Sequence, residues 1–431
     1  MSASTPPTTD PKRRRSLHNL RNLPRSPALS KYRAALEQVG KTPSKFPAFS
    51  YFSPSAWWKW FQTYAGGAFA GTCEFRTDTG PYQSVYPLRN ENGAQTVRVA
   101  MAGDWGTGTD EAEVVTQSMA PEGALPHYTI HLGDVYYIGD APAIDENCLG
   151  TQSPSDNPFT PVKWRLGRLG SFAMNGNHEM YATGEPYFSK FLPTLGWIEN
   201  GKATGQGVSY FCLENDYWRV IGLDTGYHSR GLPFLSMLGT ILPFLRPSCK
   251  LPDELLDWLR NVVKVQDDRR RGLILLTHHQ YYSAFEENYT KPAKQLAQLI
   301  DRPVLWFWGH EHRMAGYHLQ GPGKIQAHGR CVGHGGMPVE RHNPPNRDKV
   351  VFFDNRVYSE RDNFGWNGYV TLEFEDERLT ARYFDIGSIG GGENRLLIQE
   401  NWSVDGQGQL SVNIDQQCVE KDFYGPKNWG G

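Results

Sequence analysis

Five short motifs rich in aspartate and histidine occur in order through the middle of the chain, each after a short apolar run. They are Gly-Asp-Trp-Gly at 103–106, Gly-Asp-Val-Tyr-Tyr at 133–137, Gly-Asn-His-Glu at 176–179, Thr-His-His at 277–279 and Gly-His-Glu-His at 309–312. Aspartate, asparagine, histidine and tyrosine supply the oxygen and nitrogen ligands that hard and borderline metals take. One such motif would be weak support, but five in series predict a two-metal hydrolytic site.

The two Gly-Asp pairs carry the carboxylates of this predicted site. In open α/β folds, ligands bind outside the carboxyl ends of strands, and a glycine there lets the turn approach the ligand closely. Asp104 or Asp134 alone would fit a turn or a helix N-cap better. Their pairing, followed by Gly-Asn-His, favours metal ligands, because one bridging carboxylate can hold two cations about 3.5–4 Å apart.

Histidines complete the predicted ligand set. His310 and His312 are two residues apart, so two neighbouring metals can each take one of them from the same loop. His178 follows the candidate ligand Asn177 and need not bind metal. Placed over the substrate, it could stabilise the transferring group or protonate the leaving oxygen.

The remaining histidines are expected to have other roles. His279 directly follows His278 and should point away from it, so we expect His278 to be the ligand and His279 to lie behind it. Structural roles are expected for His127 and His131, which lie at the start of a predicted strand and inside it. One of three histidines in predicted loops is expected to reach the pocket: His228, His328 or His334.

The strands and helices that position these residues are predicted from the pattern of apolar and polar residues. Period-two patterns and short apolar runs predict strands over 96–102, 128–132, 171–174, 218–223, 273–276 and 304–308, and a hairpin over 369–374 and 379–384. Asp110 with Glu113 predicts the N-cap of a helix near 110–120. An amphipathic helix is predicted after Pro252, and Arg219 is predicted to face outward.

Composition limits the classes of protein that remain. The chain has 431 residues, 39% hydrophobic and 21% charged, which is typical of a soluble globular protein. Its net charge of −2 argues against attraction of the whole protein to nucleic acid. The six cysteines lack zinc-finger spacing, and neither a secretory segment nor a membrane-spanning run is apparent, so a cytoplasmic location is predicted.

The domain organisation is predicted as four segments. Residues 1–45 form a disordered basic arm, 46–95 an aromatic-rich extension, 96–386 the catalytic domain and 387–431 an irregular C-terminal extension with a strand or two. We expect the aromatic extension to pack as a flap on the catalytic domain; peripheral contact with a membrane is a less favoured alternative. The apolar segment 231–245 is read as a short core helix, with a wall of the substrate cleft or a shallow membrane contact as alternatives.

The five motifs resemble those of the calcineurin-like metallophosphoesterases, and most of all those of the purple acid phosphatases. Most of that superfamily has Asp-x-His in the first motif, whereas Gly106 occupies the histidine position here. Purple acid phosphatases also have Gly-Asp-x-Gly there and use the tyrosine of Gly-Asp-x-x-Tyr instead. By that match the tyrosine is Tyr137, so Tyr137→Phe should abolish the colour of an iron-loaded protein and Tyr136→Phe should keep it.

The resemblance implies a fold, a ligand set and a cofactor. The fold is a β-sandwich of two mixed sheets flanked by helices. The cofactor is a binuclear metal centre of iron with zinc, manganese or a second iron. The first metal would take Asp104, Tyr137 and His312, Asp134 would bridge, the second metal would take Asn177, His278 and His310, and His178 would face the substrate.

The predicted reaction is hydrolysis of a small phosphate monoester by in-line attack of a metal-bound hydroxide, with His178 assisting departure. One alternative is a phosphodiesterase acting on nucleotides or lipid head groups. The other is a metal-bound, non-catalytic scaffold that recruits partners through the basic arm and the aromatic extension.

Overall fold

The computed structural model describes most of the chain after residue 71. The described ranges are 72–91, 96–136, 138–152, 161–230, 247–358, 364–387 and 393–428. The predictions for the basic arm, for the aromatic cluster at 46–64, for the apolar segment 231–245 and for Tyr137 lie outside these ranges.

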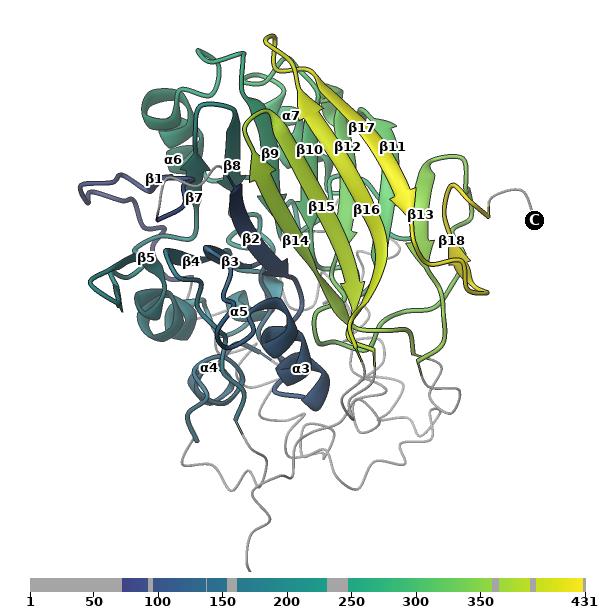
Figure 1. Ribbon diagram of the computed structural model, residues 1–431. Coiled ribbons are helices and arrows are strands. Elements are labelled where there is room, and N and C mark those ends of the chain that lie inside the picture. The colour runs from purple at the N-terminus through teal and green to yellow at the C-terminus, as the bar shows by residue number, and fades with distance from the viewer. Residues whose placement is uncertain are drawn as a thin grey trace, which may run out of the picture.

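Two mixed sheets form the body of the fold (Figure 1). In spatial order, the first consists of β1 Val85–Pro87, β7 Phe211–Glu214, β8 Trp218–Gly222, β9 Gly272–Thr277, β10 Val304–Trp308, β12 Ala327–Val332, β11 Met314–Gln320, β13 Val350–Asp354 and β18 Phe423–Tyr424. The second consists of β17 Leu410–Gln416, β16 Arg395–Val404, β15 Arg378–Asp385, β14 Gly368–Glu375, β2 Thr96–Ala102, β3 Tyr128–His131, β4 Gly170–Ala173, β5 Gly196–Glu199 and β6 Lys202–Ala203. The predicted β-sandwich is confirmed.

Short helices cover the outer faces of both sheets. The α-helices are α3 Asp110–Met119, α4 Ala141–Asn147, α5 Asn177–Met180, α6 Asp253–Trp258 and α7 Thr290–Leu296. Single π-helical turns span Tyr187–Phe191 and Leu259–Val263, and 3₁₀ turns span Leu192–Thr194 and Pro322–Lys324. Apolar residues of α6 and α7 pack on the first sheet, and those of α3 and α4 pack on the second. Among the described residues, no helix has the length and apolar character needed to cross a membrane.

The alternation of side chains along β2 shows how these layers form. Val97, Val99 and Met101 belong to the core between the two sheets. Ala100 and Ala102, on the opposite face of the strand, pack with α3 and α4. Arg98 on that opposite face is exposed, so Val97, Val99 and Met101 stand out at period two, and the bounds agree with the predicted 96–102.

Two local predictions were wrong. The N-cap of α3 is Thr109, whose side chain accepts a hydrogen bond from the backbone N–H of Ala112, so Asp110 is the first helical residue. Arg219 does not face outward: it is buried, and its Nε donates to Glu214 Oε2 at 2.7 Å. The β7–β8 hairpin pairs these two residues directly, so the carboxylate compensates the buried charge.

The C-terminal segment contributes strands to both sheets. β16 pairs antiparallel with β15, and β17 pairs with β16 at the edge of the second sheet. β18 pairs with β13 of the first sheet. β17 and β18 are therefore edge strands of the two sheets (yellow in Figure 1).

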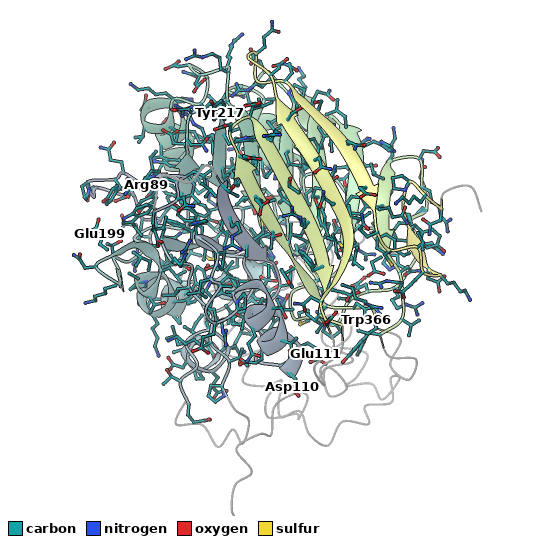
Figure 2. The ribbon with its side chains drawn as sticks, in the orientation of Figure 1. Arg89, Asp110, Glu111, Glu199, Tyr217 and Trp366 are labelled. Atoms are coloured by element: carbon teal, nitrogen blue, oxygen red, sulfur yellow. The ribbon has the colours of Figure 1, made fainter. Side chains whose placement is uncertain are left out.

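The topology brings the motif-bearing loops to one end of the sandwich. β2, β3 and β4 run parallel in the second sheet, and β8, β9, β10 and β12 run parallel in the first. Figure 2 labels Asp110 and Glu111 of α3, which follows β2, at the same end as Trp366, and Tyr217 at the opposite end. Each of the five motifs begins at the last residue of β2, β3, β4, β9 or β10 or within three residues after it.

Candidate metal centre

Tight turns after β2 and β3 present the two aspartates of the centre. Asp104 and Asp134 adopt the left-handed conformation, with φ of 57° and 71°, and His310 does the same, with φ of 65°. Residues other than glycine seldom adopt this conformation, and those that do are concentrated at functional sites. All three side chains are buried.

Close approach of the loops explains the glycines that precede the ligands. A Cβ atom at Gly176 would lie 2.1 Å from Asp134 Oδ1. A Cβ atom at Gly133, where φ is +94°, would lie 2.7 Å from the backbone nitrogen of Gly176. Any side chain at either position would push the second and third motifs apart, so these glycines determine how closely the ligands gather.

Histidines from the first sheet meet these carboxylates. His278 Nε2 lies 3.3 Å from Asp134 Oδ2, and His312 Nε2 lies 3.4 Å from Asp104 Oδ1. The backbone N–H of His310 donates to Asp104 Oδ2 at 2.7 Å. The site is therefore shared between the two sheets, with carboxylates from one and imidazoles from the other.

The orientation of the His278 ring is set by a backbone carbonyl. Its Nδ1 lies 2.9 Å from the oxygen of Leu132, which can only accept, so Nδ1 carries the proton and donates. Nε2 is left facing Asp134. This arrangement is how ligating histidines are usually held for a metal.

Two groups of side chains in the described residues have the spacing to hold a cation. Asp104, Asp134 and His278 form one, and His278, His279 and His310 form the other; within each, the ligand atoms lie within 4.8 Å of one another. The His279 ring, which we expected behind the ligands, packs against that of His310 with centroids 4.6 Å apart. Its Nδ1 contacts Thr225 Oγ1 at 3.1 Å.

Asn177 provides a direct test of whether these residues fit a metal. Its Nδ2 donates to the hydroxyl of Tyr181 at 3.0 Å. Its Oδ1 is buried and has no hydrogen-bond partner among the described residues. A buried amide oxygen without a partner is costly, and a hard cation would satisfy it. The residues therefore fit the binuclear centre that the family implies.

His178 lies beside the bridging carboxylate. Its backbone N–H donates to Asp134 Oδ1 at 3.0 Å, and its Nε2 lies 3.8 Å from Asp134 Oδ2. The ring packs between those of Tyr136 and Tyr181, with centroids 4.4 and 5.0 Å away. Its position next to the ligands is thus fixed by backbone and ring packing together.

Tyr136 is a site residue that the sequence alone did not single out. Its hydroxyl donates to Asp104 Oδ1 at 2.8 Å and to Asp134 Oδ2 at 3.1 Å, and lies 3.0 Å from His312 Nε2. The side chain is buried. The only sequence signal was the tyrosine pair itself, whose second member, Tyr137, lies outside the described residues.

Electrostatics gives the site a mixed set of charged and neutral groups. Burial by itself raises the pKa of Asp134, but the charges of His278 and His178 outweigh it and hold that pKa well below its ordinary value. Burial lowers the pKa of His278, but the Asp134 carboxylate outweighs it and raises that pKa to about 9. Burial and the charge of His278 hold the pKa of His310 well below its ordinary value. A neutral imidazole is the form that binds a metal.

His131 has the surroundings of a structural residue. Its buried ring packs edge-on against Trp105, Trp164 and Phe191. Burial lowers its pKa to about 3, so it remains neutral within the core. These contacts support the structural role that was expected for it.

The family of the chain follows from a match that contains the whole site. Residues 97–314, about half of the chain, match the family model for the calcineurin-like phosphoesterases. The chain belongs to this family and is a hydrolase. All the candidate ligands lie within the matched range. No curated protein sequence matches the chain significantly.

Solved structures with related folds include three of low sequence identity. The structure of PhoD is 13% identical, covers 78% of this chain and 74% of its own, and has a TM-score of 0.46. Purple acid phosphatase PPD1 from yellow lupin seeds is 15% identical, with coverage of 72% and 54% and a TM-score of 0.44. GAP50, the anchor in the inner membrane complex of Plasmodium, is 14% identical, with coverage of 73% and 90% and a TM-score of 0.42.

Proposed function

We propose that this chain hydrolyses phosphate monoesters at a binuclear metal centre. The ligands would be Asp104, Asp134, Asn177, His278, His310, His312 and a tyrosine of the 136–137 pair. For that tyrosine, Tyr137 remains the prediction from sequence. The cofactor would be iron with zinc, manganese or a second iron.

The observation that carries this proposal is the unsatisfied oxygen of Asn177 among converging ligands. Asp134 is held by the backbone of His178 on one side and lies against the ring nitrogen of His278 on the other. Asn177, the residue before His178, has a buried Oδ1 without a hydrogen bond inside the described chain. A pair of cations bridged by Asp134 would satisfy this oxygen, and a purely structural cluster would not leave it open.

The chemistry divides between the cations and the chain. When bound, two cations supply positive charge that lowers the pKa of water from about 15.7 toward about 7 and neutralises the phosphoryl oxygens. Asp134 keeps the two halves of the ligand set together. The water-excluding walls come from buried side chains such as Tyr136 and Tyr181.

His178 is proposed as the catalytic residue of the chain. Its ring nitrogen lies 3.8 Å from Asp134 Oδ2, so it borders the ligands without replacing one. From there it donates a proton to the oxygen that leaves phosphorus, or a hydrogen bond to the phosphoryl group during an in-line displacement. Packing between two tyrosine rings holds the imidazole in place for this task.

The proposal is tested with a matched pair of substrates. Metal-loaded protein is assayed with 4-nitrophenyl phosphate and with bis(4-nitrophenyl) phosphate, which share a leaving group and differ only in ester type. We expect a higher kcat/KM for the monoester. A preference for the diester would overturn the monoester assignment, and metal binding without turnover of either would indicate the scaffold function instead.

A further inference from the structure

The hydroxyl of Tyr136 in the second motif lies among the candidate ligands of the metal centre. We infer that Tyr136, rather than Tyr137, provides the phenolate ligand of the metal centre in this chain. The inference rests on the proposed function, and it departs from the spacing on which the resemblance to purple acid phosphatases depends.

The position of the Tyr136 hydroxyl carries the inference. Its oxygen lies 2.8 Å from Asp104 Oδ1, 3.1 Å from Asp134 Oδ2 and 3.0 Å from His312 Nε2. These are the three groups assigned to one metal, and the phenol oxygen lies within hydrogen-bond distance of all of them. A phenol oxygen at this place is positioned to become the fourth protein ligand of that metal.

Gly106 explains why a tyrosine is needed here. Gly106 occupies the position of the usual histidine ligand, and it forms an isolated parallel bridge with Val135. A Cβ atom at Gly106 would lie 2.8 Å from the carbonyl oxygen of Asp134 and 2.9 Å from Val135 Cα. A side chain at position 106 would therefore clash with the backbone of the second motif, which runs directly against it.

The same contact holds Tyr136 in place. Its backbone N–H donates to the Gly106 carbonyl at 2.8 Å, and its own carbonyl accepts from Asn147 Nδ2 of α4 at 2.7 Å. Both backbone groups of Tyr136 are thus tied to the first motif and to a helix. The absence of a side chain at Gly106 and the placement of the phenol next to Asp104 are two consequences of one backbone contact.

Binding of a ferric ion would convert the phenol to a phenolate. The oxygen–iron bond replaces the oxygen–hydrogen bond, and the released proton passes to the buffer without any change in oxidation state.

The test uses two variants that differ by one position, Tyr136→Phe and Tyr137→Phe. Each is loaded with ferric iron, and the visible charge-transfer absorption is recorded per bound iron. We expect the wild type and Tyr137→Phe to be coloured and Tyr136→Phe to lose the band. Thermal unfolding confirms that each variant is folded. Should Tyr136→Phe fail to fold, Tyr136→His is used, which supplies an imidazole and should bind iron without colour.

Three results would overturn the inference. They are a band that survives in the Tyr136 variant tested, a band lost in Tyr137→Phe alone, and a colourless iron-loaded wild type. Turnover of 4-nitrophenyl phosphate is measured on the same preparations. If the wild type hydrolyses the monoester while the colour pattern fails, the assignment of Tyr136 is wrong and the proposed function stands.

Discussion

Two buried polar clusters in this protein differ in how completely they are satisfied. Between the sheets, the guanidinium of Arg330 on β12 binds both carboxylate oxygens of Glu400 on β16, at 2.6–3.0 Å. Its Nη1 donates to the carbonyls of Tyr317 and Gly329, and Glu400 also accepts from the hydroxyl of Tyr383. Both partners of this pair make several hydrogen bonds within the chain.

The metal centre has equally buried groups, but its hydrogen bonding is incomplete. Asn177 Oδ1 and His312 Nδ1 have no hydrogen-bond partner in the described chain. The candidate ligands Asp104, Asp134 and His310 adopt left-handed backbone conformations. Native proteins leave few buried polar atoms unsatisfied, so such atoms need an explanation. The comparison assigns a structural role to the Arg330–Glu400 pair, whereas the open atoms at the second cluster support the proposed metal centre.

The largest effect is expected from Asp134→Asn. Because Asp134 is proposed to bridge both cations, the substitution should reduce bound metal and should lower monoester turnover to the background of metal-free protein. Elemental analysis and the 4-nitrophenyl phosphate assay are performed on the same preparation. Full metal content in the variant would contradict the bridging role.

His178→Ala should separate catalysis from metal binding. We expect turnover to fall by about 10²–10⁴-fold, as for loss of a general acid, with metal content close to that of the wild type. If the metal content falls as far as in Asp134→Asn, His178 is itself a ligand and its assignment is wrong.

Glu400→Gln should damage the other cluster. It leaves the buried guanidinium of Arg330 without its counter-charge, which should lower the free energy of unfolding by about 3–5 kcal/mol in denaturant titrations. The matched control is Glu373→Gln, since Glu373 pairs with Arg382 at 3.4 Å where both side chains are partly exposed. That change should cost less than about 1 kcal/mol. Equal losses in the two variants would contradict the structural role of the buried pair.

Tyr181→Phe should weaken the metal centre by the smallest amount. Removing the hydroxyl frees the amide of Asn177 to rotate, and loss of such a positioning contact typically lowers metal affinity about 10–100-fold. Tyr187→Phe is the control, because its hydroxyl donates to the Met174 carbonyl and contacts no candidate ligand. Competition with a chelator measures both affinities. An equal decrease in the two would show that Tyr181 acts through general stability.

Much of the fold was predictable because the order of apolar and polar residues along a strand reflects which of its faces are buried. β2 and β10 have the predicted bounds. β2 shows a period-two apolar pattern, and β10, which is buried on both faces, is apolar along its length. The motif order likewise placed the ligands at one edge, because parallel strands share their carboxyl end. The prediction that Arg219 faces outward was wrong because the carboxylate that compensates its buried charge, that of Glu214, comes from the neighbouring strand.

The details of the site depended on contacts between motifs. The motif spacing predicted Tyr137, which lies outside the described residues. The contact of the Tyr136 hydroxyl with Asp104 depends on the bridge between Gly106 and Val135, which joins two separate motifs. The position of His279 beside His310 is also a product of two loops from neighbouring strands. The spacing of residues within one motif does not show which loops of other motifs lie against it in the fold.

The central claim is that the chain is a two-metal phosphoesterase, and a metal titration tests it most directly. Metal-free protein is loaded stepwise with Mn²⁺, and bound metal and monoester turnover are measured at each step. The account predicts that binding saturates at two ions per chain and that turnover reaches its maximum only when both are bound. Full turnover at one ion per chain, or no turnover at two, would contradict it.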